Sequence, residues 1–361
     1  MKYKLNPSFQ CQLTENGSLF LKIPDGESLI YTEQIDFLIE LLHKIDGYNS
    51  ISEIHSKLKN NNYDIDLEDL QLLLETFKQA NILKPNIDLF ELQNTDLTFE
   101  ELNKYDRQIK NYVTLKNNDL LSAIEYQKNL KKSKVAIICV GGIGSYISYS
   151  LVAMGIGEVR LIDTDCIELS NTSRQMLYDE DDIGKLKVVT AAEKLKKVNP
   201  RVSIEHKNIF LTEETKDEVS QFIDGCDLII NCADHPRGKI PYIVDKISQE
   251  LDIPWLIFGP FHFYKIACGP FMIPGKTKSY EELFPKSLFK ENDKIKEINS
   301  RIESNIMDPY NGLAAKVASI EVVKFLTGYE DTILYNKRLI INTKDWSIQK
   351  YDVLNGEYIN D

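Results

Sequence analysis

The sequence predicts an α/β protein in which a Rossmann-like domain follows a small winged-helix-like α+β domain. The main observation lies in residues 135–163, where a β-branched apolar run ends at a glycine-rich turn. A helix-compatible segment follows, and then a second apolar run that ends at Asp163. A strand, a glycine turn, a helix and a second strand closed by an acid form the layout of a nucleotide-binding βαβ unit. The second observation is that short strands and then three amphipathic helices can be traced in residues 1–85.

The elements of the N-terminal domain, residues 1–85, are expected in a fixed order. Strands are predicted at 19–23 and 28–31, and helices at 35–42, 52–58 and 67–80. Ser50 lies where a side chain would cap the second helix. The acidic segment 64–69 argues against a DNA-binding winged helix, because phosphate contacts require Lys and Arg. A dimerisation domain is the alternative to a binding module.

Residues 86–98 are polar and irregular, which predicts a linker, and residues 99–361 form the second domain. A helix around 104–108 precedes the first strand. The elements expected after the βαβ unit are helix 188–198, strands 202–205, 226–232, 255–258 and 264–271, helix 312–326 and a β-rich tail at 338–351. Residues 279–310 are charged and poor in strand signals, so a long loop is expected there.

Composition excludes several classes of protein. The net charge of −12 argues against a nucleic-acid partner. The first residues lack the apolar core of a signal peptide and no apolar run approaches the length of a membrane span, so we expect a cytoplasmic protein that does not bind membranes. None of the six cysteines forms a C-x-x-C pair, which fits a reducing compartment.

The glycine turn predicts contact with phosphate groups. Gly142 and Gly144 would let the backbone approach phosphates, and the helix that follows offers N–H groups and a positive dipole end. Asp163 lies where a ribose hydroxyl would be bound. The spacing is G-G-x-G, with Ile147 in place of the third glycine of the dinucleotide fingerprint. On this motif alone, a tight turn in an ordinary α/β domain is the alternative interpretation.

Polar and cationic residues follow the second strand. They are Asp165, Asn171, Arg174, Gln175 and Lys187. An enzyme that acts on the triphosphate of ATP needs cations there, because negative charge shifts between phosphate oxygens during transfer. An NAD-dependent dehydrogenase is disfavoured, since no catalytic pair for hydride transfer is evident.

Five motifs occur in order from the glycine turn onward. They are Gly-Gly-Ile-Gly at 141–144, Leu-Ile-Asp-Thr-Asp at 161–165, Asn-Thr-Ser-Arg-Gln at 171–175, Asp-Ile-Gly-Lys-Leu-Lys at 182–187 and Cys-Ala-Asp-His at 232–235. Together they resemble the ThiF-type adenylating family, which includes ubiquitin-activating enzymes and the sulfur-carrier activators of thiamin and molybdopterin synthesis. The resemblance runs from about 103 to 325. Segments 233–236, 274–277 and 311–315 resemble its peptide-modifying branch, of the microcin C7 and pantocin A type.

The resemblance implies that a carboxylate attacks the α-phosphate of ATP, so that an acyl adenylate forms and pyrophosphate leaves. It places Asp163 on the ribose hydroxyls and Lys187 on the α- and β-phosphates. Asn171, Arg174 and Gln175 would clamp the phosphates, Arg174 through charge-assisted hydrogen bonds. For Asn171 the alternative is a structural role as a turn cap.

The resemblance also implies a metal ion and a second subunit. Asp234 would hold Mg²⁺, and Arg107 would reach the nucleotide of the other protomer in a homodimer. Asp165 belongs to the nucleotide-binding set, with ordering of the loop as the alternative. Many relatives carry a zinc ion on two C-x-x-C pairs, which are missing here, so we expect no zinc. Residues 279–310 contain no cysteine for a thioester, which argues against ubiquitin-like transfer.

The N-terminal domain resembles the PqqD-like modules that bind leader peptides of ribosomally made natural products. We therefore expect residues 1–85 to bind the leader of a precursor peptide, by strand addition to a sheet edge. The predicted function is ATP-dependent adenylation of a carboxylate of that precursor during antibiotic biosynthesis. A Glu or Asp side chain activated for cyclisation is favoured. The alternatives are the C-terminal carboxylate, with nucleotide attachment through a P–N bond, and a non-catalytic partner that only binds the precursor.

Overall fold

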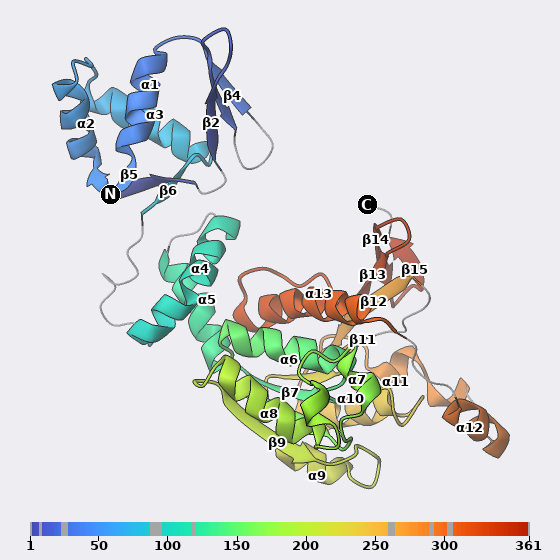
Figure 1. Cartoon of the computed structure of the whole chain (residues 1–361). Helices are drawn as coiled ribbons and strands as arrows, with labels where there is room; N and C mark the ends of the chain where they lie inside the picture. Colours follow the sequence, from blue (N-terminus) through green and yellow to red (C-terminus); the bar gives the residue numbers. More distant parts are fainter. Residues whose placement is uncertain are drawn as a thin grey trace. The chain divides into compact units, whose positions relative to one another are not determined.

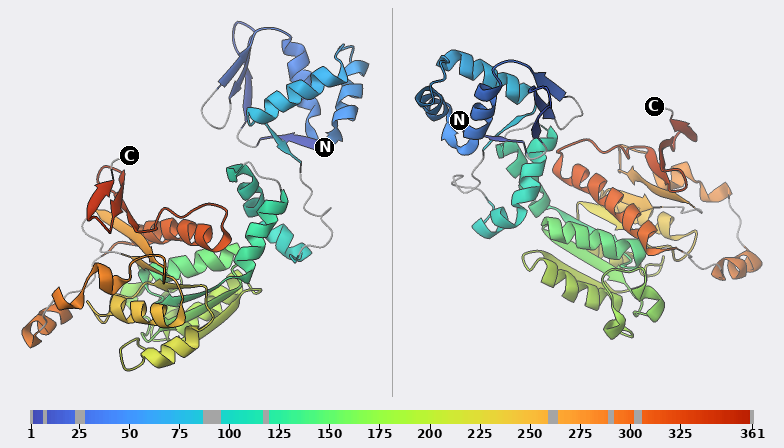
Figure 2. Two further views of the ribbon diagram at one scale, coloured as in Figure 1. Left: turned by 180° about the vertical axis from the view of Figure 1, so that it is seen from behind. Right: turned by 45° about the horizontal axis from the view of Figure 1, so that its top comes forward.

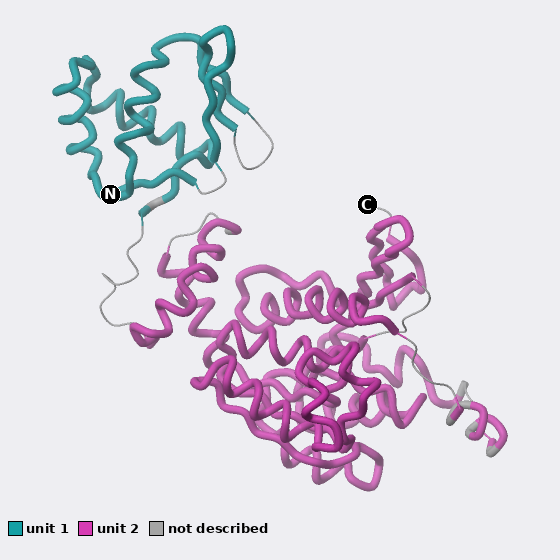
Figure 3. The backbone as a smooth tube through the Cα atoms, in the orientation of Figure 1, with its two compact units in different colours: residues 1–95 teal, residues 96–361 magenta. Residues whose placement is uncertain are grey.

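In the computed structural model the chain forms two compact units, residues 1–95 and 96–361 (Figure 3). The structure describes residues 2–6, 9–22, 28–86, 96–116, 120–258, 264–288, 292–301 and 306–359. Most of the linker expected at 86–98 therefore lies outside the described residues. Within the described ranges, no helix combines the length and the apolar character needed to cross a membrane.

The first unit combines helices with two small sheets (Figure 1). One sheet has the order β2-β3-β4, formed by β2 (Gln10–Leu13), β3 (Leu19–Lys22) and β4 (Ser28–Tyr31). The helices are α1 (Ile35–Lys44), α2 (Ile51–Asn60) and α3 (Leu67–Gln79). The other sheet has the order β5-β1-β6, formed by β1 (Lys2–Leu5), β5 (Asp46–Ser50) and β6 (Leu83–Pro85). The two predicted strands and three predicted helices are confirmed.

Local sequence explains the start of α2 but not the sheet around β1. Ser50 Oγ accepts a hydrogen bond from the Glu53 N–H (3.3 Å), and Glu53 Oε2 accepts one from the Ser50 N–H (2.6 Å). This capping box satisfies two N–H groups at the helix start. β1 alternates polar and apolar residues over only four positions, and its Lys4 pairs with Asp46 on one side and Lys84 on the other, both far away in the sequence. Such a sheet leaves only a weak local signal.

The second unit is built on a nine-stranded sheet in the order β15-β14-β13-β12-β11-β10-β7-β8-β9. The parallel strands are β7 (Lys134–Ile138), β8 (Glu158–Asp163), β9 (Ser203–Asn208), β10 (Leu228–Asn231) and β11 (Trp255–Phe258). The antiparallel strands are β12 (Lys265–Met272), β13 (Lys337–Asn342), β14 (Ser347–Asp352) and β15 (Glu357–Ile359). The parallel half confirms the predicted Rossmann-like α/β fold class.

The helices of the second unit are α4 (Phe99–Lys116), α5 (Leu120–Lys132), α6 (Gly142–Met154), α7 (Leu169–Thr172), α8 (Lys187–Val198), α9 (Lys216–Ile223), α10 (Ile240–Leu251), α11 (Tyr280–Leu283), α12 (Asp293–Ser300) and α13 (Asp308–Thr327). Ala136 and Ile138 of β7 share one core with Val219 of α9 and Ile243 of α10. Since side chains alternate along a strand, the other residues of β7 face away from this core. α6 packs against α8 and lies beside α13 (Figures 1 and 2).

Two boundaries differ from the prediction. α13 begins at Asp308, four residues before the expected start at Gly312, because Pro309 is well suited to a first helical turn. The charged stretch 279–310, expected as a loop, contains the short helices α11 and α12 among its described residues. Ser279 caps α11 by accepting a hydrogen bond from the Glu282 N–H (3.2 Å).

Candidate nucleotide site

A cavity of about 280 Å³ lies beyond the carboxyl ends of β7, β8 and β10. Its polar lining is formed by Asp163, Thr164, Asp165, Asp234 and His235. Its apolar lining includes Ile138, Ile162, Phe210, Leu211 and Ile240. The carboxyl ends of parallel strands are where open α/β sheets bind ligands. The fold thus brings the predicted acids of two separate motifs to one cavity.

The two glycines predicted to face phosphates are also required by packing. A Cβ on Gly144 would lie 2.0 Å from the Cys139 carbonyl oxygen, and a Cβ on Gly142 would lie 2.5 Å from Asn311 Nδ2. Cys139 itself has a positive φ of 72°, so the chain turns sharply as β7 ends. Asn311 is 2% exposed and donates to the Arg174 carbonyl oxygen (3.4 Å). It therefore joins the glycine turn to the Arg174 loop, a role that the sequence analysis does not identify.

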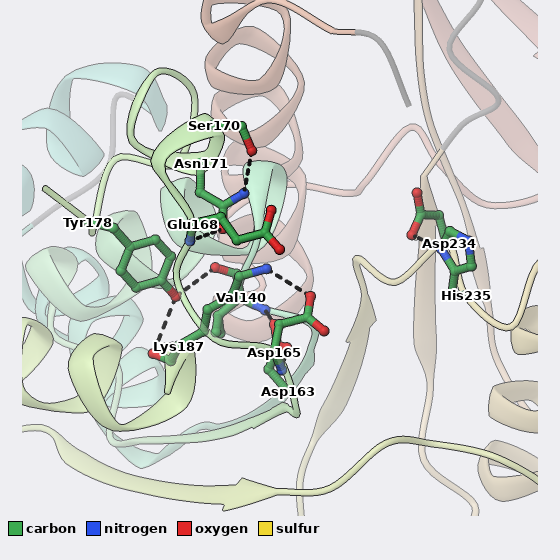
Figure 4. Close-up of polar contacts among 10 residues, drawn as sticks. All are labelled: Val140, Asp163, Asp165, Glu168, Ser170, Asn171, Tyr178, Lys187, Asp234 and His235. Atoms are coloured by element: carbon green, nitrogen blue, oxygen red, sulfur yellow. Dashed lines mark hydrogen bonds and ion pairs between the residues drawn. The ribbon is translucent and has the colours of Figure 1, made fainter. Parts of the chain in front are cut away.

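Asp163 is buried and bonded to the backbone around it. Its Oδ2 accepts a hydrogen bond from the Val140 N–H (2.9 Å), and its Oδ1 accepts one from the Asp165 N–H (2.9 Å) (Figure 4). Both oxygens thus hold the two strand-end loops together. Asp163 also lines the cavity, but much of its hydrogen-bonding capacity is used by the backbone of the two loops.

Lys187 and Asp165 form an ion pair beside Asp163. The Lys187 ammonium lies 2.8 Å from Asp165 Oδ2, with 6% of the lysine side chain and 58% of the aspartate side chain exposed. Burial alone would lower the pKa of Lys187, but the bond to Asp165 and the charge of Asp163 outweigh it and raise the pKa. The ammonium is therefore charged at neutral pH. The Tyr178 hydroxyl, which the sequence analysis also misses, donates to the carbonyl oxygens of Val140 (2.9 Å) and Lys187 (3.3 Å).

The loop before Lys187 is fixed by a buried carboxylate. Asp182 is 5% exposed and accepts hydrogen bonds from Lys185 Nζ (2.9 Å), from the Asp179 N–H (3.2 Å) and from Lys194 Nζ. Burial would raise the pKa of Asp182, but the bonds from Lys194 and Lys185 hold it well below its ordinary value. This anchor places Lys187 at the first position of α8.

The segment 171–175 contributes one capping residue and two polar groups. Asn171 Oδ1 accepts a hydrogen bond from the Glu168 N–H (3.1 Å), which is the structural role considered as the alternative. Arg174 donates from Nη1 to the Ser170 carbonyl oxygen. Gln175 is 5% exposed, and its Oε1 has no hydrogen-bond partner within the described part of the chain. A buried amide with an unpaired end next to a glycine turn fits a polar ligand.

Asp234 and His235 approach from the loop after β10, opposite Asp163 and Lys187 (Figure 4). Asp234 is 59% exposed on its side chain, and its Oδ1 lies 2.8 Å from His235 Nδ1. No group of three or more His, Cys, Asp or Glu side chains that could hold a metal ion occurs among the described residues. A single carboxylate on the cavity wall does fit Mg²⁺, which is commonly bound by one or two carboxylates together with substrate phosphates.

Arg107 is not brought to the cavity of its own chain. It lies on α4, its side chain is 98% exposed, and its Nε is 3.8 Å from Asp106 Oδ2. The cavity lining includes no residue of α4. Within one chain, the structure therefore separates Arg107 from the other predicted site residues.

Comparison with known proteins identifies relatives of this arrangement. The family model described as ThiF family matches residues 105–356. The molybdopterin-synthase adenylyltransferase of Haemophilus influenzae is 29% identical over 231 residues, which cover 63% of this chain and 86% of that protein. The chain is 24% identical over 263 residues, 73% of its length, to the adenylyltransferase and sulfurtransferase UBA4 of Candida albicans. It spans only 56% of the length of that protein.

Two kinds of solved structure are similar over nearly the whole chain. E. coli MccB with MccA-N7isoASN superposes with a TM-score of 0.72 at 26% identity, covering 98% of this chain and 97% of that one. PaaA superposes with a TM-score of 0.71 at 25% identity, covering 96% and 99%. MccB has also been solved with ATP and with N-formylated MccA, at TM-scores of 0.72 and 0.71.

Proposed function

The chain belongs to the ThiF family, and on that premise we propose that it activates a carboxylate of a ribosomally made precursor peptide by adenylation with ATP. The observation that carries the proposal is the set of polar groups around one cavity at the ends of three parallel strands. The exposed Asp234 lines the cavity, the buried Lys187 ammonium contacts the lining residue Asp165, and the buried Gln175 amide lies beside the glycine turn. These groups suit a nucleotide triphosphate, and the similarity to MccB and PaaA extends over both units.

The cavity offers a separate place for each part of ATP. The apolar side chains of Ile138, Ile162 and Leu211 suit the adenine ring, and the exposed carboxylate of Asp165 suits the ribose hydroxyls. Gln175 and Lys187 lie near the glycine turn, where the phosphates would meet the N–H groups at the start of α6. We thus extend the ribose assignment from Asp163 to Asp165, because the carboxylate of Asp163 already binds two backbone N–H groups.

In the proposed reaction a peptide carboxylate oxygen attacks the α-phosphorus, and the bond to the bridging oxygen of pyrophosphate breaks. Lys187 and Arg174 would stabilise the charge that gathers on the phosphate oxygens as this bond breaks. Asp234 would hold Mg²⁺, which neutralises phosphate charge when bound. The chain would work by positioning and charge, with no covalent intermediate on its own side chains.

The peptide partner is proposed from the same similarity. MccB is known in complex with MccA, so a precursor peptide is the corresponding partner here. Residues 1–85 would bind its leader, and the outer strands β2 and β4 of the β2-β3-β4 sheet offer edges for strand addition. A Glu or Asp side chain is the proposed acceptor, with the C-terminal carboxylate as the alternative. Arg107 is proposed to complete the site of a second copy, because its exposed side chain does not line the cavity of its own chain.

Pyrophosphate exchange tests the proposal. Labelled pyrophosphate should enter ATP when the enzyme is mixed with a peptide from a short reading frame beside its gene, and not without the peptide. Lys187→Met should abolish the exchange. Lys197→Met is the matched control, because Lys197 is exposed in the last turn of the same helix and lies outside the cavity lining. Release of ADP and phosphate instead of AMP and pyrophosphate would contradict adenylation.

A further inference from the structure

Arg338, on β13, is a partly buried cation that has no anionic partner among the described residues. Its guanidinium carbon lies 5.8 Å from the centre of the Phe284 ring. Its Nε is fully buried and has no hydrogen-bond partner in the described part of the chain. Across the ranges that the structure describes, Arg338 makes no ion pair or side-chain hydrogen bond. Burial lowers the pKa of this guanidinium, although the neighbouring phenols of Tyr280 and Tyr351 act in the opposite direction.

The nearby acids are already engaged with other groups. Asp245 is 4% exposed and accepts hydrogen bonds from Trp255 Nε1 (3.2 Å) and from the Glu281 N–H (3.3 Å). Glu281 Oε1 accepts a hydrogen bond from the Lys286 N–H (2.9 Å), and its Oε2 lies 3.9 Å from Lys286 Nζ. Neither acid pairs with Arg338.

Aromatic contact alone does not offset the cost of this charge. Removing an ion from water costs more free energy than a cation–π contact returns. A guanidinium in this state is therefore suited to an anion that the described residues do not provide. Its planar N–H groups match a carboxylate through two parallel hydrogen bonds.

A chain of contacts connects Arg338 with the nucleotide cavity. Ile240 lines the cavity and is the first residue of α10. Two residues further, the Tyr242 hydroxyl donates to the Phe284 carbonyl oxygen (2.7 Å). The rings of Tyr242 and Tyr280 are 4.9 Å apart, and those of Tyr280 and Phe284 are 5.0 Å apart. Arg338 thus contacts an aromatic cluster whose Tyr242 lies on the same helix as the cavity residue Ile240, and all of these residues belong to the second unit.

We propose that Arg338 binds a carboxylate of the peptide substrate through the terminal nitrogens of its guanidinium, with the Phe284 ring beside the guanidinium. The inference rests on the proposed function, since a peptide must reach the cavity for this carboxylate to be presented. It assigns the second unit a determinant for acidic peptides that is separate from the leader-binding role of the first unit.

The test uses small probes of known chemistry on the full-length protein with ATP bound. N-acetylglutamate N-methylamide carries a side-chain carboxylate, N-acetylalanine carries a C-terminal one, and N-acetylglutamine N-methylamide is the neutral control. We expect one of the two acids to bind the wild type at least about tenfold more tightly than the neutral probe, as charge-assisted hydrogen bonds imply. The acid that binds identifies which carboxylate is recognised.

Arg338→Met should abolish this preference, and Arg338→Lys should restore part of it. Lys337→Met is the matched control, because adjacent residues of a strand face opposite sides of the sheet and the preference should persist. The melting temperature of Arg338→Met should equal or exceed that of the wild type, since no ion pair is lost. Equal binding of acidic and neutral probes, an unchanged preference in Arg338→Met, or a clear loss of stability in that variant would overturn the proposal. Pyrophosphate exchange is measured separately, so a failure of adenylation and a failure of carboxylate recognition give different results.

Discussion

Gly144→Ala should damage the protein through packing at the end of β7. The new Cβ would lie 2.0 Å from the Cys139 carbonyl oxygen, about 1 Å closer than real Cβ contacts allow. That carbonyl cannot move freely, because the Cys139 N–H is bonded to the Ile162 carbonyl oxygen at 2.7 Å and so fixes β7 to β8. Overpacking against backbone falls at the upper end of its usual cost, about 3 kcal/mol. For a unit of this size that corresponds to a melting temperature lower by about 6–12 °C.

The matched control is Gly312→Ala on α13. Its Cβ would lie 3.4 Å from the Tyr146 ring, which is close to ordinary contact, and alanine favours a helix over glycine by about 1 kcal/mol. Its melting temperature should therefore be unchanged or slightly higher. Thermal unfolding and ATP titration calorimetry on both variants measure the two effects, with ATP binding lost only in Gly144→Ala. A Gly144→Ala protein that melts within about 2 °C of the wild type would refute the packing argument.

Three further outcomes follow from the site. Gly142→Ala should weaken ATP binding by about tenfold, and adding Asn311→Ala should recover most of it, because the two groups compete for one space; equal losses in the single and double variants would contradict this. Asp182→Asn should cost about 3 kcal/mol in chemical denaturation at neutral pH. Since folding lowers the pKa of Asp182, the stability that its carboxylate contributes is present above about pH 3.9 and is lost as the pH falls further. A stability difference between Asp182→Asn and the wild type that does not change with pH would argue against the ion pairs of the buried Asp182. Arg107→Ala and Lys187→Met should each be inactive, and a mixture with proven subunit exchange should regain up to about a quarter of the wild-type sites. Exchange without recovered activity would remove Arg107 from the partner's site.

The sequence predicts this fold well where local chemistry decides the structure. Ser50 is followed at the third position by Glu53, and this capping box alone sets the start of α2. The apolar runs of β7 and β8 are flanked by glycines and acids, so the strands and the ends that carry the site can be placed from the sequence. The sheet of β1, β5 and β6 cannot, because each strand is short and its partners are distant.

The same limit explains which site residues escape prediction. Asn311 reaches the Arg174 carbonyl oxygen across 137 positions, and its packing on Gly142 depends on how α13 lies along α6. Tyr178 acts through backbone carbonyl groups, which no side-chain motif records. Arg338 stands out by the absence of a partner within the described structure, and a sequence pattern cannot express that.

The polar groups of the site fall into two classes by the partners they already have. The oxygens of Asp163 and Oδ1 of Asn171 are bonded to backbone N–H groups, so releasing them would loosen the turns that shape the cavity. Lys187 and Arg174 are held by an exposed carboxylate and by a carbonyl oxygen, which phosphate oxygens can replace without disturbing a strand or a turn. We infer that on ATP binding the phosphate oxygens replace the present partners of Lys187 and Arg174, while the hydrogen bonds of Asp163 and Asn171 to the backbone stay in place. The cations are then close to their working positions before the nucleotide arrives, which reduces the ordering cost of binding and favours charge stabilisation in the transition state.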